Sequence, residues 1–293
     1  MRYIPAPIKG VISLILYSIS LFFSFVMLFL TFLLEKLLPF GFMKKIIDML
    51  YHELPLLWIK MNRFAFRLTG SRLEIELPSG LSMQTFYAVT SNHQSWADIL
   101  ILYDALSPHI SMLKFFMKKQ LKWVPLVGQV TWIYGFPFLH RHTHAELKKH
   151  PEWKQRDYEA ARKACERFKH QPGSIMIFAE GTRFTEKKHE KQQSLYRYLL
   201  KPKAGGLALG LQCLGDKINT LIDVTIIYPK DHHSFWDYCC GRADKIIVKA
   251  KSIPLDNHLK GDYENDYEFR RNFQRFLNQL WLEKDQLINK EYS

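Results

Sequence analysis

The stretch TFYAVTSNHQSWADILILYDAL, residues 85–106, predicts a β-strand followed directly by an α-helix. Residues 85–90 are rich in β-branched and aromatic side chains, which is typical of a strand. From Trp96 to about Leu106 the chain is apolar and free of glycine and proline, which favours a helix. The polar residues 91–95 therefore lie at the end of a strand, where α/β sheets form their ligand crevices.

The same alternation continues on both sides of this stretch. Residues 73–77, 174–178, 222–228 and 246–250 are predicted strands. Helices are predicted at 151–170, at 205–214 and near the C-terminus, where apolar residues share one helical face (Phe269, Phe273, Phe276, Leu277 and Leu280). Strands separated by helices predict an α/β fold with a mixed central sheet flanked by helices, in a domain spanning residues 69–293.

The N-terminal part has a different composition. Residues 11–34 are 24 consecutive residues without a charge. As a helix they would extend about 36 Å, more than the hydrocarbon core of a bilayer, so we expect a membrane helix rather than a signal peptide or a core helix. Residues from about 40 to 68 predict an amphipathic helix, either in the membrane interface or on the protein surface. We therefore expect residues 1–68 to be a membrane anchor.

The net charge of +13 favours a polyanionic partner, such as a nucleic acid, an anionic membrane or a phosphorylated substrate. The basic residues are spread along the chain without an arginine-rich arm or a zinc-finger pattern, so we expect no nucleic acid partner. The four cysteines contain no C-x-x-C pair. They are typical of reduced thiols, which favours a domain on the cytosolic side of the membrane.

His93 and Asp98 are the first candidates for catalysis. A carboxylate one helical turn after a histidine can hold one ring nitrogen, while the other nitrogen remains available as a base. His232 and Asp237 repeat this spacing, also just after a predicted strand. The spacing alone therefore does not choose between the two pairs.

The sequence FAEGTRFT, residues 178–185, is the second candidate. Gly181 allows a ligand to approach the backbone closely, and the guanidinium of Arg183 can bind a phosphate through two hydrogen bonds. The alternative is an ordinary turn with a Glu–Arg pair on the surface.

Taken together, these blocks resemble the phospholipid/glycerol acyltransferase family, whose signatures are N-H-x-x-x-x-D and E-G-T-R. Further similar blocks follow in the family's order: KQLKWVPLVG at 119–128, GFPFLHR at 135–141, KPKAGG at 201–206 and DVTI at 223–226. The resemblance covers residues 85 to 230 and selects His93 over His232. Gln120 and His140 depart from the usual residues, as does the block Asp223-Val224-Thr225, where many members have a Val-Pro pair. These departures bear on the identity of the acceptor.

The resemblance implies a glycerol-3-phosphate acyltransferase-like fold with N-terminal membrane helices. It also implies that His93, oriented by Asp98, deprotonates the free hydroxyl of a lysophospholipid, most simply 1-acyl-glycerol-3-phosphate. That hydroxyl then attacks the thioester of acyl-CoA or acyl carrier protein, a co-substrate, without a cofactor. The acceptor would be bound by residues from three blocks, namely Lys119, Arg141, Glu180, Gly181, Thr182 and Arg183. In a bacterium this implies an inner-membrane protein whose domain faces the cytoplasm.

Four alternatives stay open. His140, His142 and His144 would share one face of a strand and could bind a metal, although we expect none. Ser91 and Ser95 flank His93, as a hydrolase would allow, but the sequence contains no G-x-S-x-G. The chain could be a non-catalytic scaffold that binds anionic lipid. Finally, the aromatic cluster of Trp123, Trp132, Tyr134, Phe136 and Phe138 could be core or could line an acyl-chain groove.

Overall fold

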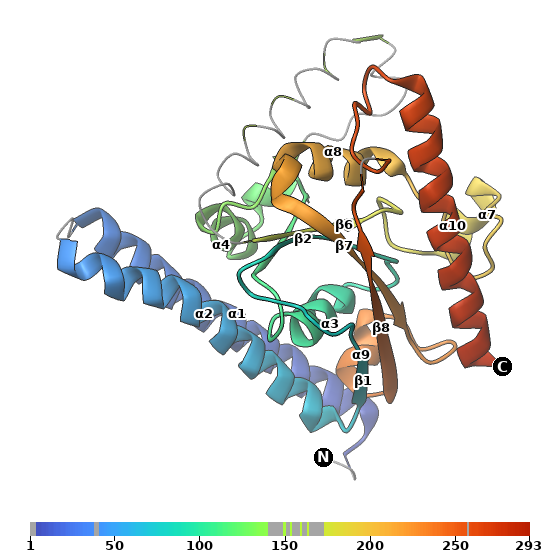
Figure 1. Cartoon of the computed structure of the whole chain (residues 1–293). Helices are drawn as coiled ribbons and strands as arrows, with labels where there is room; N and C mark the ends of the chain where they lie inside the picture. Colours follow the sequence, from blue (N-terminus) through green and yellow to red (C-terminus); the bar gives the residue numbers. More distant parts are fainter. Residues whose placement is uncertain are drawn as a thin grey trace.

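The computed structural model describes residues 4–37, 41–139, 149–150, 153, 159, 163, 173–256 and 258–293. Two long N-terminal helices, α1 (Ala6–Leu37) and α2 (Gly41–Thr69), lie side by side as a hairpin along one flank of an α/β domain (Figure 1). The predicted helices at 11–34 and about 40–68 thus extend by a few residues in the structure. The predicted helix at 151–170 lies almost entirely outside the described residues.

Six strands form the central sheet, in the order β1-β8-β7-β2-β6-β3. Among the described strands β7 and β8 are antiparallel and the other neighbours are parallel, so the predicted mixed sheet is confirmed. The strands are β1 (Arg72–Glu76), β2 (Phe86–Ser91), β3 (Leu113–Phe115), β6 (Ser174–Phe178), β7 (Ile218–Ile227) and β8 (Lys245–Pro254). A second, two-stranded sheet joins β4 (Met117–Lys118) to β5 (Phe138–Leu139).

Helices cover both faces of the central sheet (Figure 1). Strand β7 shows why, because its side chains alternate between two hydrophobic cores. Ile222, Val224 and Ile226 belong to the core shared with α3 (Ala97–Leu106). Leu221 and Ile227 belong to the core shared with α8 (Ala204–Leu214) and the C-terminal α10 (Tyr267–Tyr292). The shorter helices are α4 (Val127–Ile133), α7 (Glu186–Gln192), α9 (Phe235–Cys240) and the 3₁₀ turns η1 (Lys119–Trp123) and η3 (Gly215–Lys217).

In helix α1 the polar and apolar sides are exchanged relative to a surface helix of a water-soluble domain. The side that packs on the protein carries small or polar residues, among them Gly10, Ser13, Ser20 and Thr31. Large apolar side chains, such as Ile19 and Phe22, are more than half exposed on the other side. In water this arrangement would leave a long apolar surface uncovered. Helix α1 is also long and apolar enough for a membrane, which fits the predicted membrane location.

Candidate active site

His93 and Asp98 form a closely coupled pair where β2 ends and α3 begins. Nδ1 of His93 lies 2.8 Å from a carboxylate oxygen of Asp98, and the two side chains are 12% and 0% exposed. The same oxygen accepts hydrogen bonds from the backbone N–H groups of Gln94 (2.7 Å) and Ser95 (3.0 Å). With Nδ1 engaged by the carboxylate, the imidazole presents Nε2 to a substrate.

The second oxygen of Asp98 accepts a hydrogen bond of 2.5 Å from the hydroxyl of Tyr228, the residue that follows β7. Tyr228 is buried, and its burial together with the nearby Asp98 carboxylate raises the pKa of its phenol well above the ordinary value. The phenol therefore remains protonated and donates at all pH values at which the protein would work. Tyr228 was not among the residues predicted for the site.

Two further contacts fix the loop that carries His93. The side-chain amide of Asn92 donates to the carbonyl of Ile226 (2.8 Å) and accepts from its N–H (2.9 Å), so it continues the pairing of β2 with β7 beyond the end of the strand. The imidazole stacks on the ring of Phe178, with 3.8 Å between centroids, and Phe178 stacks on Phe115. The plane of the base is thus set by a neighbouring strand.

The predicted second block lies directly beside the first. Its Glu180 is fully buried, and its two carboxylate oxygens accept hydrogen bonds from the backbone N–H groups of His93 (3.1 Å) and Leu200 (3.2 Å). The backbone N–H of Phe184 donates to the carbonyl of His93 at 2.7 Å. Burial raises the pKa of Glu180 to about 8, against the lowering effect of the two hydrogen bonds. Glu180 therefore supports the histidine loop from inside the protein.

Arg183 lies next to this support. Its guanidinium stacks over the ring of Trp96, 4.5 Å from the centroid, at the N-terminal end of α3. Lys188 donates to the Thr182 hydroxyl and to the Arg183 carbonyl, both at 2.8 Å, which holds the loop in place. Gly181 has a φ of +71°, a conformation in which other residues are strained.

The structure thus brings together six of the eight predicted site residues, namely His93, Asp98, Glu180, Gly181, Thr182 and Arg183. Lys119 begins η1, where its side chain is exposed. Arg141 lies outside the described residues, as do the three histidines at 140, 142 and 144. Among the described residues no group of three or more histidine, cysteine or acidic side chains could hold a metal ion.

The alternative pair, His232 and Asp237, has a looser geometry. The closest approach is 3.8 Å, and the His232 side chain is 47% exposed. Asp237 binds Arg242 (3.1 Å) and the hydroxyl of Ser234, which caps α9. The two pairs share the same spacing in the sequence, but His93 and Asp98 lie closer together and are more deeply buried than His232 and Asp237.

The two serines beside His93 have other partners. Ser91 donates to the side chain of Asn92, and the hydroxyl of Ser95 accepts from the backbone of Ala97, each at 3.3 Å. Both residues are buried. This arrangement does not support a serine nucleophile.

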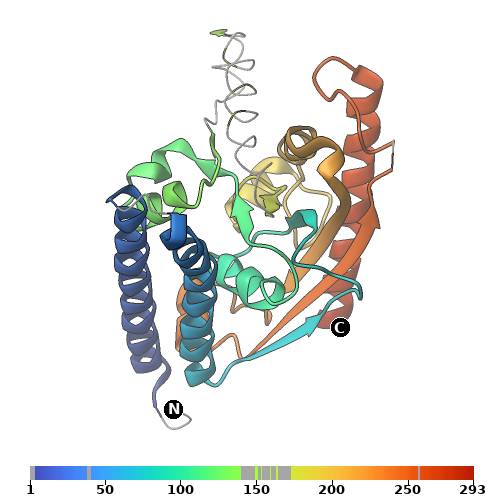
Figure 2. The ribbon, with the colours of Figure 1, turned by 60° about the vertical axis from the view of Figure 1, so that its left-hand side comes forward.

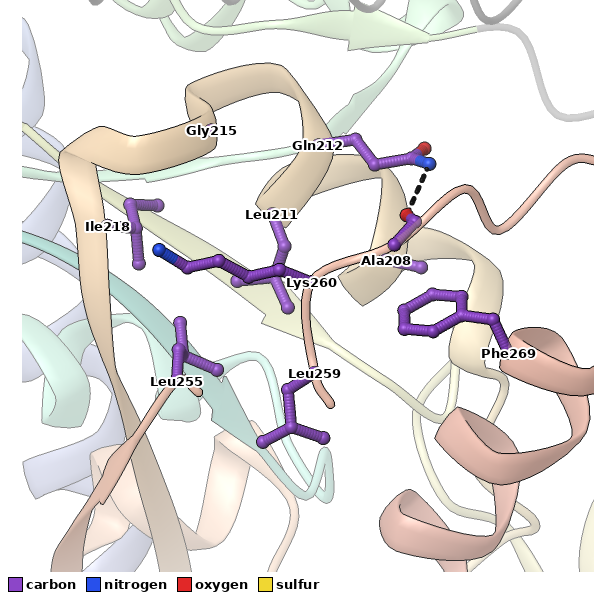
Figure 3. A pocket seen from close by; sticks show the side chains of 10 residues that line it. Ala208, Leu211, Gln212, Gly215, Ile218, Leu255, Leu259, Lys260 and Phe269 are labelled. Atoms are coloured by element: carbon purple, nitrogen blue, oxygen red, sulfur yellow. Dashed lines mark hydrogen bonds between the residues drawn. The ribbon is translucent and has the colours of Figure 1, made fainter. Parts of the chain in front are cut away.

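A cavity of about 170 Å³ lies elsewhere, between α8 and the chain leading into α10 (Figure 3). Its wall is mainly apolar, with Leu211, Leu255 and Phe269, and Gln212 crosses it to bind the carbonyl of Gly261. None of the predicted site residues lines it, so the cavity is separate from the histidine site.

Comparison with known proteins gives consistent results. A 1-acyl-sn-glycerol-3-phosphate acyltransferase delta from Mus musculus is 29% identical over 219 residues, which cover 70% of this chain and 52% of the relative. Lysocardiolipin acyltransferase 1 from Mus musculus is 28% identical over 153 residues, 48% of this chain and 38% of the relative. The chain therefore spans about half the length, or less, of these curated relatives.

The crystal structure of the 1-acyl-sn-glycerophosphate (LPA) acyltransferase PlsC from Thermotoga maritima aligns over 98% of both chains. The TM-score is 0.57 and the sequence identity 17%, so this likeness establishes the fold. The model of the family described as Acyltransferase matches residues 78–229, more than half of the chain, including both histidine and arginine blocks. The chain belongs to the Acyltransferase family.

Proposed function

We propose that this protein transfers a fatty acyl group from a thioester to the free hydroxyl of a lysophospholipid, with 1-acyl-glycerol-3-phosphate as the acceptor and phosphatidic acid as the product. The observation that carries the proposal is the imidazole of His93, held by the buried Asp98 and bonded through its own backbone to the loop that carries Arg183. The family and the named relatives support the same reaction class. The donor would be acyl-CoA or acyl carrier protein, with no further cofactor.

The proposed reaction needs one proton relay. Nε2 of His93 takes the proton of the acceptor hydroxyl as its oxygen attacks the thioester carbonyl. The tetrahedral intermediate then expels the thiolate, which receives the proton from His93, so the base is regenerated. The Asp98 carboxylate stabilises the transient imidazolium. No acyl-enzyme forms, because the acceptor itself is the nucleophile.

Arg183 is the proposed ligand of the acceptor's phosphate. Its guanidinium lies over the ring of Trp96, 4.5 Å from the centroid, and this contact reduces the side-chain freedom lost when Arg183 binds an anion. Lys119 and Arg141 remain further candidates for this contact. The net charge of +13 also favours an anionic lipid acceptor over a neutral one.

The test is transfer to a panel of acceptors. Purified protein in lipid vesicles is given labelled acyl-CoA or acyl carrier protein, with lysophosphatidic acid, other lysophospholipids or glycerol-3-phosphate. We expect diacyl product with lysophosphatidic acid as the best acceptor. Release of free fatty acid without transfer would support a hydrolase instead. No thioester consumption with either donor would support the lipid-binding scaffold.

The Tyr228→Phe variant tests how Asp98 is held. It leaves a buried carboxylate oxygen without its donor, and hydrogen bonds to charged groups contribute about 1.5–3 kcal/mol, so we expect kcat to fall by about tenfold or more. The KM for the acceptor should change little, because the loop that carries Arg183 is unchanged.

Tyr103→Phe is the matched control for this variant. The hydroxyl of Tyr103 is also buried and donates to a carbonyl, that of Leu113 at 2.7 Å, away from Asp98. We expect this control to lose some thermal stability and to keep the wild-type kcat. If both variants lowered kcat by the same factor, or if neither lowered it, Tyr228 would have a purely structural role.

We also propose that the hairpin, within the predicted anchor of residues 1–68, attaches to one leaflet of the membrane without spanning it. Near one end of α1, a Cβ on Gly10 would lie 2.6 Å from Cys240 and 2.7 Å from Trp236, both on α9. Near the other end, the ring of Phe32 lies 5.9 Å from that of Trp132 on α4. Gly10 and Phe32 are 22 positions apart, which corresponds to about 33 Å of helix, the thickness of a bilayer core. If α1 spanned the bilayer, α9 and α4, which pack on its two ends, would have to lie on opposite sides of the membrane.

Tags at the two ends of the chain distinguish these membrane arrangements. In sealed membrane vesicles, we expect a protease added outside to remove an N-terminal and a C-terminal tag together or to spare both. A single-spanning protein with its ends on opposite sides is the control. Removal of only one tag from intact vesicles would show that α1 crosses the membrane.

A further inference from the structure

A group of exposed aromatic and basic side chains lies on η1 and α4. Trp123 is 80% exposed, Trp132 45% and Val124 39%, and the side chains of Lys118 and Lys122 are exposed beside them. We call these five residues the η1–α4 surface. Large apolar side chains that gather on a surface mark a site of contact with a protein or a membrane.

The backbone of this segment forms a tight turn that keeps Trp123 and Val124 exposed. The chain turns so tightly that a Cβ on Gly128 would lie 2.0 Å from the carbonyl oxygen of Lys122, so only glycine fits. Leu126 has a φ of +65°, a strained conformation for a leucine. Trp123 and Val124 lie within this turn, between Lys122 and Leu126. Their exposure is therefore a consequence of a tightly constrained backbone.

The η1–α4 surface continues the apolar face of the hairpin. Trp132 contacts Phe32 near the end of α1, with 5.9 Å between ring centroids, and the ammonium of Lys122 lies over the Trp132 ring at 5.9 Å. Figure 2 shows α4 beside the end of the hairpin where α1 passes into α2. A lipid surface that covers the outer side of α1 therefore also reaches this segment.

Charge indicates which kind of surface fits. The sequence contains no acidic residue between Asp104 and Glu146, and three lysines of this segment have exposed side chains, namely Lys118, Lys119 and Lys122. Tryptophan is enriched at the level of lipid headgroups, and lysine binds the anionic headgroups there. A protein partner would need acidic residues to match this segment and would have no reason to contact α1 as well.

We propose that the η1–α4 surface is a second membrane contact, inserted at headgroup level in an anionic bilayer beside α1. Contact along the outer side of α1 supports the domain along a single line, so the domain can still tilt about that line. A second contact beside α1 limits this tilt, so the α/β domain keeps one orientation toward the bilayer. This inference concerns membrane contact and does not depend on which reaction the protein catalyses.

A fluorescent amino acid incorporated into the full chain tests this contact. The probe replaces Val124 in one protein, Ile19 on the outer side of α1 in a second, and Leu195 in a third. Leu195 is 93% exposed and lies in the loop after α7, remote from the hairpin. Each protein is reconstituted in vesicles of phosphatidylcholine and phosphatidylglycerol, with and without bromine-labelled acyl chains, which quench only fluorophores in contact with lipid.

We expect quenching at positions 19 and 124 and none at 195. In the position-124 protein, Trp123→Glu should reduce quenching to the level of position 195, whereas Leu195→Glu should not change it. The Lys118→Gln/Lys122→Gln pair should lower the ratio of inserted to free segment about fivefold per lysine. In vesicles of phosphatidylcholine alone, the position-124 protein without further mutation should show the same reduction in the ratio of inserted to free segment.

Each outcome decides the proposal. Quenching at 19 without quenching at 124 would overturn the second contact and leave membrane attachment by α1 intact. Absence of quenching at positions 19 and 124 would overturn both the membrane attachment by α1 and the second contact. Equal quenching with and without phosphatidylglycerol would overturn the role assigned to the lysines.

Discussion

His93→Ala is expected to lower kcat for acyl transfer by a factor of about 10²–10⁴, the usual contribution of a positioned general base. The KM for the acceptor should change little, because Arg183 and its loop remain in place. The imidazole is only partly exposed and stacks on Phe178, so its removal leaves a small gap at the edge of the core. The measurement is initial-rate transfer by purified protein, with circular dichroism to show that the variant is folded.

His232→Ala is the control that the chain itself supplies. It removes a histidine from the same H-x-x-x-x-D spacing, but from a pair whose closest approach is 3.8 Å. We expect this variant to keep wild-type activity. A folded His93→Ala protein that remained active while His232→Ala lost activity would show that the wrong pair had been chosen.

The sequence predicted the elements that obey simple periodicity. Strands at 174–178 and near 85–90, and helices near 96–106 and 205–214, lie within two residues of their predicted ends. Strand β7 begins before its predicted start at 222, and β8 ends beyond its predicted end at 250, because the antiparallel pairing between them continues into polar residues such as Thr220 and Lys251. Strand β3 was missed, since three residues carry too little pattern to recognise.

Within the site, the sequence identified residues joined by short spacings and missed those supplied by distant elements. His93 and Asp98 are five residues apart, whereas Tyr228 reaches Asp98 from 130 residues further along the chain. Phe178 was named as the end of a strand and the start of the second block, but its stacking on His93 was not predicted. Glu180 was named within that block, and its fully buried carboxylate binds the backbone groups of its neighbours.

The aromatic cluster shows a different limit. Core packing and the lining of an acyl-chain groove were both left open, and Phe136, which is 7% exposed, belongs to the core. Trp123 and Trp132 are 80% and 45% exposed and do not. Composition alone could not separate them, because a tryptophan suits both a core and a membrane interface.

Lys284→Met is expected to destabilise the fold by about 3–5 kcal/mol at neutral pH, the usual cost of removing one partner of a buried ion pair. Lys284 extends from α10 into the core and lies 2.6 Å from Asp223 on β7, with both side chains almost completely buried. It also donates to the carbonyl of Val224 (2.5 Å) and approaches the Thr225 hydroxyl. Asp223 is one of the departures from the family's usual blocks, and Lys284 is the residue that neutralises it.

The pair itself should add little net stability. Burial raises the pKa of Asp223 and lowers that of Lys284, in both cases against the attraction between them. Each charged form is therefore disfavoured in the folded state. Replacing both residues, as in Asp223→Leu with Lys284→Met, should recover most of the stability lost in the single variant. Lys245→Met, which breaks the exposed contact with Glu74 on β1 (3.0 Å), should cost at most about 1 kcal/mol.

The stability deficit of Lys284→Met should depend on pH with a defined sign. In the variant, burial without the lysine raises the pKa of Asp223 further, so folding retains a proton that the unfolded chain releases above about pH 4. Because the Asp223 pKa is already raised in the folded wild type, the deficit grows by about 1.4 kcal/mol per pH unit between that pKa and the higher one of the folded variant. Urea titrations at pH 5 and pH 7.5, in the same mild detergent, measure this difference directly. Two results would contradict this explanation: a stability deficit that is equal at the two pH values, or a double variant that is no more stable than Lys284→Met. Either would mean that the unpaired charge of Asp223 is not what destabilises the protein.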